Sequence, residues 1–393
     1  MKKTGLILSG GGARAAYQVG VLKAINRILP KDSPIPIDII SGTSAGAING
    51  VALATFADNY RLGIRHLERI WAGFECAQVY RTDFLGVSGS LMRLVRSLVV
   101  GRRFKNDAVS VLDNAPLQKL LSEVIHFDRI QNNIDGNFLH ALAINCSGID
   151  SGESVSFFQG HHSLENWARP RRIGVRSRLT LSHLMASSAI PMVFPAVKIH
   201  REYYADGAVR QLAPVSPALH LGAEKVLVIG VSDRPNSNSN RRESTSPIYP
   251  SPARVMGHML NAAFIDSLEA DVERLRRINR TLDRIPESVQ RKEKMELKKI
   301  QILDIAPSMS LDALAGQHAE EMPKALKLAL GGSGNASHSG SGLLSYLLFS
   351  KGYCRALIEL GYHDAITRSD ELLEFFRQET EVTQEQSSLA SNE

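Results

Sequence analysis

Residues 42–46 read Gly-Thr-Ser-Ala-Gly, so that one serine, Ser44, stands between two glycines, Gly42 and Gly46. The pattern follows the strand-like run 37–40 and opens a stretch of small residues, an order that predicts strand, tight turn and helix. A serine hydroxyl becomes a nucleophile when its oxygen is exposed, close to a base and beside donors for the oxyanion that forms on attack. Ser44 is therefore the candidate nucleophile, and the flanking glycines let the backbone pass closely at the turn.

A glycine-rich loop, made of Gly10, Gly11 and Gly12, precedes this pattern in the chain. It follows the apolar run 5–9 and leads into a helix expected over about 15–29. Without side chains, backbone N–H groups can converge on a negative atom, and the dipole of the following helix favours negative charge there. The loop therefore indicates an oxyanion hole or a phosphate cradle. Arg14 would either fix this loop or contact an anionic substrate.

A third motif, Asp206-Gly207-Ala208, follows a strand-like run at 193–199. An aspartate at a strand end with glycine after it predicts a sharp turn. Because Asp-Gly is one of the commonest turn dipeptides, this motif gains its weight from the two motifs that precede it in the chain.

In this order, the glycine-rich loop, G-T-S-A-G and D-G-A resemble the motifs of the patatin-like phospholipases, a family of Ser-Asp dyad lipid acyl hydrolases related to cytosolic phospholipase A2. The resemblance implies that Ser44 is the nucleophile, that Asp206 is its partner, and that the loop 10–12 forms the oxyanion hole. It also implies supporting roles for Arg14, Gly42, Gly46, Gly207 and for Pro191 in the family-like block 187–195. The resemblance spans roughly residues 4–231.

One position departs from the family pattern. Residue 15 is alanine where the family usually has glycine, and alanine fits a helix start but not a positive φ. The departure affects the expected conformation of the loop and leaves its N–H donors in place.

The resemblance further implies a reaction without histidine. Asp206 would take the proton of Ser44 directly while the serine oxygen attacks an ester carbonyl, and water would then release the acyl group. A carboxylate is a weak base in water, so this scheme requires partial desolvation of Asp206 and a largely apolar pocket. Phospholipids or lysophospholipids are the implied substrates, and no cofactor is implied. Simpler acyl esters, thioesters and acyl transfer to an alcohol share the same acyl-enzyme and stay open.

Two other functions compete with this one. Residues 10–15 satisfy G-x-G-x-x-A between strand and helix, the fingerprint of dinucleotide binding. That fold requires an acidic residue at the end of the second strand, whereas Asp38 is expected inside that strand. In a Ser-His-Asp hydrolase, Asp206 would instead orient a later histidine such as His220 or His258.

The composition fits a single enzyme with a large core, because the chain has 393 residues and 44% hydrophobic content. Cys76, Cys146 and Cys354 are far apart and lack C-x-x-C spacing, which fits a reducing compartment. The twelve histidines are scattered, so no metal site is indicated. No run of about 18 apolar residues offers a membrane span, and the apolar run after residue 3 ends too soon for a signal peptide. We therefore expect a cytoplasmic enzyme.

The net charge of +6 is unevenly distributed. A basic patch follows His161 and His162 and consists of Arg169, Arg171, Arg172, Arg176 and Arg178. Such a patch suits anionic headgroups and predicts peripheral contact with the inner membrane surface. The run 91–103, with apolar residues and arginines at helical spacing, either lies in a membrane interface or packs on the core. Nucleic acid is not an expected partner, because no recognised motif or aromatic platform accompanies the basic residues.

Alternating strand-like and helix-like runs predict an α/β fold with a mostly parallel central sheet flanked by helices. The resemblance specifies this as the three-layer patatin-like fold. Further strands are expected at 138–145, 155–158, 225–231 and 300–305, the last at an edge of the sheet. Apolar residues at steps of three or four predict a long amphipathic helix over 255–285.

We expect an α/β hydrolase core at 1–307, in which 233–299 form a mobile loop and a long helical insertion. Residues 308–393 form a helical C-terminal extension, with a Gly/Ser-rich linker at 331–342, helices at 343–360 and 370–377, and a polar tail. This extension would shield the sheet, form a homodimer contact or lean over the lipid entrance.

Overall fold

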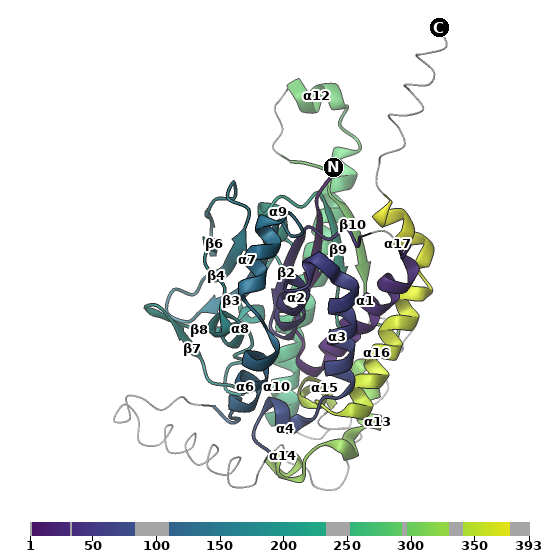
Figure 1. The fold of residues 1–393 in the computed structure, drawn as a ribbon. Helices are drawn as coiled ribbons and strands as arrows, with labels where there is room; N and C mark the ends of the chain where they lie inside the picture. Colours follow the sequence, from purple (N-terminus) through teal and green to yellow (C-terminus); the bar gives the residue numbers. More distant parts are fainter. Residues whose placement is uncertain are drawn as a thin grey trace.

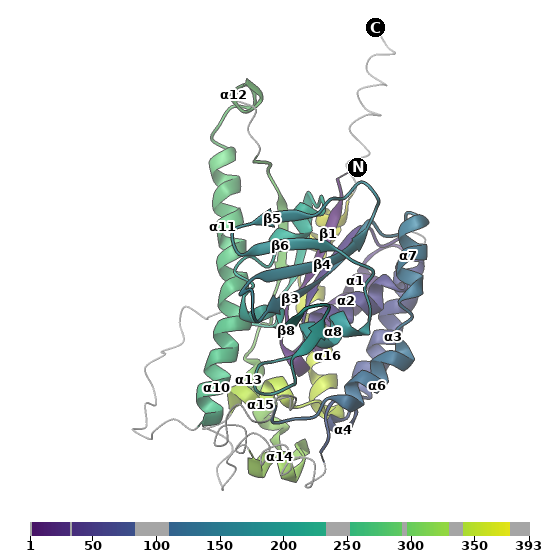
Figure 2. The same cartoon turned by 90° about the vertical axis from the view of Figure 1, so that its left-hand side faces the viewer.

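The computed structural model describes residues 2–31, 34–82, 110–232, 252–292, 297–329 and 341–377. Four sequence predictions fall outside these ranges: the amphipathic run at 91–103, the loop at 233–251, most of the Gly/Ser-rich linker, and the polar tail from 378. The described part of the chain forms a central sheet with helices on both faces (Figure 1, Figure 2).

Within the described residues, the strands of one sheet follow the spatial order β10-β9-β1-β2-β3-β4-β6-β5, and β8 and β7 join it beside β3. The strands are β1 (Thr4–Leu8), β2 (Ile39–Thr43), β3 (Ala141–Gly148), β4 (Ser154–Gly160), β5 (Trp167–Arg169), β6 (Arg172–Arg176), β7 (Val197–Ile199), β8 (Glu202–Asp206), β9 (Lys225–Ile229) and β10 (Gln301–Ile305). From β10 to β3 all neighbours are parallel, whereas β4 and β8 pair with β3 in antiparallel fashion. The predicted α/β fold is therefore confirmed, and β10 is an edge strand as expected.

Alternate side chains of the central strands point to opposite sides of the sheet, and helices cover both sides. The central strands are therefore buried on both faces. In β1, Leu6 and Leu8 belong to one hydrophobic cluster and Ile7 to another. The first cluster includes side chains of α1 (Ala16–Ile28), α2 (Ala45–Ala54), α3 (Tyr60–Ala72) and α16 (Lys351–Ile366). The second includes side chains of α9 (Ser216–His220) and α11 (Ser267–Leu282). The result is a helix–sheet–helix arrangement in three layers.

Shorter helical segments connect these elements. They are the 3-10 turn η1 (Gly12–Ala15), α4 (Cys76–Val79), α6 (Ala115–Val124), α7 (Asp128–Asp135), α8 (Leu181–Ser187), α10 (Pro252–Asn261), α12 (Glu287–Lys292), α13 (Leu311–Gln317), α14 (Lys324–Ala329), α15 (Ser341–Leu347) and α17 (Ser369–Phe376). A π-helical turn (Ala262–Asp266) joins α10 to α11, so the long helix predicted over 255–285 is confirmed (Figure 2). It ends at Leu282, ahead of Pro286.

The C-terminal helix α16 packs closely on α1. At their crossing, a Cβ on Gly361 would lie 2.1 Å from the Tyr17 carbonyl oxygen, and one on Gly20 would lie 2.0 Å from that of Ile358. Glycine on both helices therefore lets the two backbones touch. Helices on both sides of the boundary expected at 307 contribute to one hydrophobic cluster.

The prediction of one helix over 343–360 was wrong, because the chain forms α15 and α16 with a break at 348–350. The Leu347 carbonyl, which a continuous helix would satisfy internally, accepts from the Tyr80 hydroxyl at 2.7 Å. The apolar residues up to the break are all buried, and Ser350, which follows them, is the N-cap of α16. Ser350 was therefore an available signal for the start of α16, and the Tyr80 contact lies at the end of α15.

The strand expected over 193–199 was also too long, since β7 covers only Val197–Ile199. The preceding residues turn: Val193 and Phe194 donate their N–H groups to the Ile190 carbonyl, and Met192 has φ 66. This turn brings 190–194 to the region of Ser44, as described below.

Candidate active site

Ser44 stands at a sharp turn between β2 and α2. Its backbone angles, φ 55 and ψ −130, lie outside the regions that residues with side chains usually adopt, at a cost of about 1–3 kcal/mol. The Ser44 N–H donates to the hydroxyl of Ser187 at 2.9 Å, and its carbonyl accepts from the N–H groups of Ala47 and Ile48. The strained turn that G-x-S-x-G predicts is thus present, at the N-terminus of a helix.

The register of β3 brings Ser44 and Asp206 together. Thr43, the last residue of β2, lies opposite Asn145, and Asp206, the last residue of β8, lies opposite Cys146. On the opposite edge of β3, strand β4 pairs with both Asn145 and Cys146. Strands β2 and β8 therefore pair with the same edge of β3, one after the other, and their ends meet there. The nucleophile candidate and the aspartate, which are far apart in the sequence, therefore lie at adjacent points of the sheet.

The Asp206 side chain is completely buried, with 0% of its surface exposed. Its Oδ1 accepts from the Ala208 N–H at 3.0 Å, whereas its Oδ2 has no hydrogen-bond partner among the described residues. Burial raises the pKa of Asp206 to about 7, although the nearby Ser44 hydroxyl and the Ala208 N–H both lower it. A carboxylate with a pKa near neutrality and an unpartnered oxygen is suited to accept a proton.

The glycine-rich loop lies beside Ser44. The space that a Cβ on Gly10 would occupy is 3.1 Å from the Ser44 Cβ. Gly12 has φ 56, and a Cβ there would lie 2.2 Å from the carbonyl oxygen of Tyr346, so this position admits only glycine. No described residue accepts a hydrogen bond from the N–H groups of Gly10, Gly11 or Gly12. They are therefore available as donors to an oxyanion at Ser44.

A small apolar cavity of about 30 Å³ opens at Ser44. Its walls include Ile48, Trp71, Phe74, Phe194, Leu347 and Phe349. The rings of Trp71, Phe74 and Phe349 pack against one another, with centroids 4.9 to 6.2 Å apart. The predicted apolar surroundings are thus present on this side of Ser44.

Two buried polar residues that the sequence analysis did not assign hold the turn from behind. The Asn145 side-chain amide donates to the Gly42 carbonyl at 2.9 Å, and its Oδ1 accepts from the Ser156 hydroxyl at 2.7 Å. Ser187 donates its hydroxyl to the Asn145 carbonyl at 2.7 Å and accepts from the Ser44 N–H. A lone asparagine inside the apolar run 141–146 was the available signal for Asn145.

The sequence also provided no indication that C-terminal residues would line the cavity. Tyr346, Leu347 and Phe349 line it from α15 and the break that follows. They belong to no motif, so no sequence signal pointed to this position.

The other supporting residues lie around the same turn. Gly42, Gly46 and Gly207 each stand against neighbouring backbone. Pro191 is exposed in the turn between Ile190 and Phe194, both of which line the cavity. Ala15 has φ −66, so the departure from the family pattern causes no strain.

A protein-family model described as Patatin-like phospholipase matches residues 6–219, more than half of the chain and all three motifs. The chain belongs to this family. Among curated relatives, Lysophospholipase nte1 of Aspergillus terreus is 53% identical over 57 residues, which are 14% of this chain and 3% of that protein. The cGAMP-activated phospholipase of Pseudomonas aeruginosa is 27% identical over 216 residues, which are 55% of each chain.

Solved structures resemble the patatin-like chain only weakly. Human GIVD cytosolic phospholipase A2, solved with a fluorophosphonate inhibitor, matches with a TM-score of 0.43 at 13% identity over 96% of this chain and 59% of that one. VipD from Legionella pneumophila matches with a TM-score of 0.38 at 13% identity, over 94% of this chain and 67% of that one. The patatin-like chain spans about half the length, or less, of the curated relatives named above.

Among the described residues, no histidine joins Ser44 and Asp206 in this patatin-like chain. His220 stacks on Trp167 with centroids 5.0 Å apart, and His258 is exposed on α10. Neither donates to Asp206, whose Oδ1 binds Ala208 and whose Oδ2 has no partner in the described part of the chain. The geometry of a Ser-His-Asp triad is therefore not formed by these residues.

The dinucleotide alternative lacks its acidic residue at the required place. Asp38 lies just before β2, not inside it as expected, and its Oδ2 accepts from the Thr4 N–H at 2.7 Å. It thus stands at the N-terminal end of the strands, whereas the glycine loop lies at their C-terminal end. The C-terminal residue of β2 is Thr43.

The basic patch lies on the β5–β6 side of the sheet. Arg169, Arg171, Arg176 and Arg178 are exposed and Arg172 is half-buried. The Arg176 guanidinium donates to the carbonyls of Gly160 and His161, so this arginine also holds the neighbouring loop.

Three further observations concern only the described residues. No helix among them is long and apolar enough to cross a membrane. No group of three His, Cys, Asp or Glu side chains in these ranges could hold a metal ion. Cys76, Cys146 and Cys354 are buried free thiols.

Proposed function

We propose that this patatin-like chain is a lipid acyl hydrolase in which Ser44 is the nucleophile, Asp206 the base and residues 10–12 the oxyanion hole. The observation that carries the proposal is the meeting of a strained serine turn with a buried aspartate whose Oδ2 is unpartnered. The apolar cavity at Ser44 and the free N–H groups of the glycine loop support the same reaction.

The reaction follows from this arrangement. Asp206 Oδ2 takes the Ser44 proton as the serine oxygen bonds to the ester carbonyl carbon, and the carbonyl oxygen gains a negative charge. The N–H groups of the loop 10–12 stabilise that charge, a contribution commonly worth about 10²–10³-fold per donor. When the intermediate collapses, the carbon–oxygen bond of the ester breaks and the leaving alcohol receives the proton from Asp206. Water repeats the sequence on the acyl-enzyme and restores both groups.

A phospholipid or lysophospholipid is the proposed substrate. The cavity walls are aliphatic and aromatic, which suits an acyl chain and not a charged group. A chain bound there would also displace water from the neighbourhood of the buried Asp206 and keep it a stronger base.

Peripheral contact with an anionic membrane at a cytoplasmic face is part of the proposal. The exposed arginines of the basic patch support attraction to anionic headgroups. Exposed apolar side chains flank the segments that carry Asp206 and the cavity turn: Met192 is 52% exposed, Val209 46% and Leu212 69%. Such side chains gain free energy when they leave water for lipid.

The test compares wild type with Ser44→Ala and Asp206→Asn on a fluorescent phospholipid, a lysophospholipid and p-nitrophenyl esters of increasing chain length. We expect both variants to lose at least about 10³-fold in turnover with an unchanged circular dichroism spectrum. Turnover that persists in folded Ser44→Ala would refute the proposed nucleophile. A thioester substrate and an added alcohol acceptor in the same assay measure thioester cleavage and acyl transfer.

A further inference from the structure

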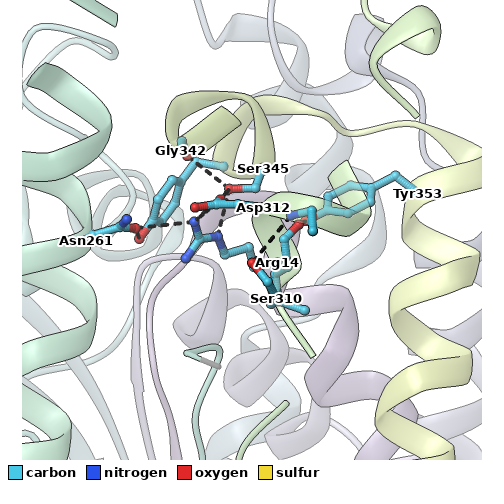
Figure 3. Close-up of polar contacts among 10 residues, drawn as sticks. Arg14, Asn261, Ser310, Asp312, Gly342, Ser345 and Tyr353 are labelled. Atoms are coloured by element: carbon cyan, nitrogen blue, oxygen red, sulfur yellow. Dashed lines mark hydrogen bonds and ion pairs between the residues drawn. The ribbon is translucent and has the colours of Figure 1, made fainter. Parts of the chain in front are cut away.

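Arg14, the side chain that follows the glycine loop, is buried and surrounded by protein acceptors. Only 2% of its side chain is exposed. Its Nε and one terminal nitrogen donate to the Ser345 hydroxyl at 2.9 and 2.7 Å, and the same nitrogen donates to Asp312 Oδ1 at 2.7 Å. A longer bond of 3.2 Å reaches Asn261 Oδ1. Figure 3 shows the guanidinium enclosed by these side chains, which come from α10, α13 and α15.

The partners of Arg14 are bound to one another. The Ser345 hydroxyl lies 2.6 Å from Asp312 Oδ1 and 2.9 Å from the Gly342 carbonyl, so it joins α15 to α13 (Figure 3). The ring of Tyr346 lies under the Arg14 guanidinium, 4.0 Å from its carbon. The whole cluster is therefore tied together. Arg14 links it to the glycine loop, because its N–H donates to the Gly11 carbonyl at 3.2 Å.

This cluster touches the oxyanion loop at two points. One is Arg14 itself, within η1. The other is the Tyr346 carbonyl oxygen, which occupies the place a Cβ on Gly12 would need. A buried guanidinium is stable only while its charge is paired and its donors are bound, so the backbone that carries Arg14 is held where Asp312 and Ser345 stand.

We propose that Asp312 and Ser345 are positioning residues of the active site, which fix the oxyanion loop through Arg14. The proposal rests on the function proposed above, because an oxyanion hole acts only if its donors stand within about 2.7–3.1 Å of the developing charge. In this arrangement the Arg14 guanidinium binds Asp312 and Ser345 and does not contact the substrate. The two residues lie outside the segment 6–219 that the family model matches, and no motif includes them.

The main alternative is that the cluster only ties helices together. A structural tie would change stability without changing the loop or the chemical step. The two roles differ in the mobility of the loop backbone and in the turnover of each intact site.

The test uses the full chain with Asp312→Ala and Ser345→Ala, and with Asp312→Asn, which removes the charge but keeps an acceptor for Arg14. Ser310→Ala is the matched control, because the Ser310 hydroxyl accepts from the Ala313 N–H at the start of α13 and makes no contact with Arg14. Two quantities are measured: amide hydrogen exchange of a peptide that covers residues 9–15, and kcat and KM on p-nitrophenyl butyrate. Sites are counted by titration with a fluorophosphonate, so that kcat refers to intact sites.

We expect exchange in 9–15 to accelerate at least about tenfold in Asp312→Ala and Ser345→Ala, and kcat per titrated site to fall about 10–100-fold with KM within twofold. For Asp312→Asn, the exchange rate in 9–15 and kcat per site should lie between those of the alanine variants and wild type. If the alanine variants do not fold, Asp312→Asn alone provides the test. Exchange and kcat per site equal to those of Ser310→Ala, whatever the melting temperature, would overturn the proposal. If wild type neither hydrolyses esters nor reacts with the fluorophosphonate, the proposed function fails, and the exchange comparison still decides whether Asp312 and Ser345 hold the loop.

Discussion

The segment that carries the motifs, residues 4–219, and the C-terminal segment, residues 308–377, reach Ser44 in different ways. The first supplies the candidate reacting groups on sharp backbone turns at the ends of β1, β2 and β8. The second supplies surfaces: the Tyr346 carbonyl against the glycine loop, Leu347 and Phe349 in the cavity wall, and the acceptors of Arg14. One segment carries the candidate reacting groups and part of the cavity wall, and the other completes the space around them.

The difference explains what each segment leaves in the sequence. A nucleophile turn needs serine and glycine at fixed spacing, because only those residue types combine the hydroxyl with the required backbone. A cavity wall needs only apolar volume, which many residue combinations supply. The family model accordingly matches 6–219 and stops short of the helices that complete the cavity.

The largest effect is expected from Asp206→Asn. This variant tests whether the buried carboxylate of the motif segment lowers the free energy of unfolding. The pKa of Asp206 is raised to about 7 from its usual value of 3.8, so ionising it opposes folding. Its stabilising contribution is complete below about pH 4 and is lost as the pH rises to about 7. Above pH 7 the variant should be more stable than wild type by up to about 4 kcal/mol.

Urea denaturation of both proteins at pH 4, 6 and 8 measures this difference. A constant difference across the three pH values would show that folding does not raise the pKa of Asp206, and would remove the basis for its role as a base. Asp271→Asn is a useful contrast, because burial also raises the pKa of that carboxyl group but Asp271 caps the Val215 N–H, away from Ser44.

The next largest effect concerns the C-terminal segment. Phe349→Ala should lengthen the cavity beyond the ring that now closes against Trp71 and Phe74, and shift the preferred ester to longer acyl chains. The stability loss should be about 2 kcal/mol, below the range of about 3–5 for a fully enclosed phenylalanine, because one side of the ring already faces empty space. Kinetics on p-nitrophenyl esters of increasing length, with urea melts, measure both effects.

Phe376→Ala is the matched control, since Phe376 is 6% exposed and Phe349 7%, and both lie in the C-terminal segment. Phe376 lies on α17, away from the cavity. Phe376→Ala should lower the free energy of unfolding by a similar amount and leave the preference for acyl-chain length unchanged. Identical profiles in all three proteins would mean that the C-terminal segment does not shape the substrate site.

The smallest effect is expected from Ser187→Ala, within the motif segment. The variant leaves the Ser44 N–H without its acceptor and should lower kcat about tenfold by loosening the serine turn. Ser156→Ala is the control, because Ser156 binds the same Asn145 but does not touch Ser44. Steady-state kinetics at saturating ester measure kcat of Ser187→Ala and Ser156→Ala. Equal kcat values would mean that Ser187 contributes to packing and does not position Ser44.

Much of the fold followed from local patterns. Most of the strands and the long helix were predicted because alternation and the three-to-four spacing are properties of short segments. The short strands β5 and β6 were not predicted. The errors fell where distant contacts decide. The helix expected over 343–360 breaks where the Leu347 carbonyl accepts from the Tyr80 hydroxyl and the Phe349 N–H, and the strand expected from 193 gives way to a turn that pairs with 111–112.

The candidate site divides in the same way. Ser44 and the three glycines were singled out by their types and spacing, and the role of Asp206 was implied by the family resemblance. The open alternatives for Arg14 were not separable by sequence, because a buried and an exposed arginine look alike until Asp312 and Ser345 are seen beside it. Asn145 and Ser187 stayed unassigned, since single polar residues in apolar runs have many uses.

By itself, the sequence determined the family, the alternation of strands and helices, and the residue types available for acyl chemistry. These are encoded in short stretches where each side chain's own geometry is decisive. The tertiary structure decided which residues meet: the register of β3 sets Asp206 beside Ser44, and burial raises the pKa of that carboxyl group to about 7. Proximity and desolvation depend on packing among segments far apart in the chain, and for that reason no local pattern contains them.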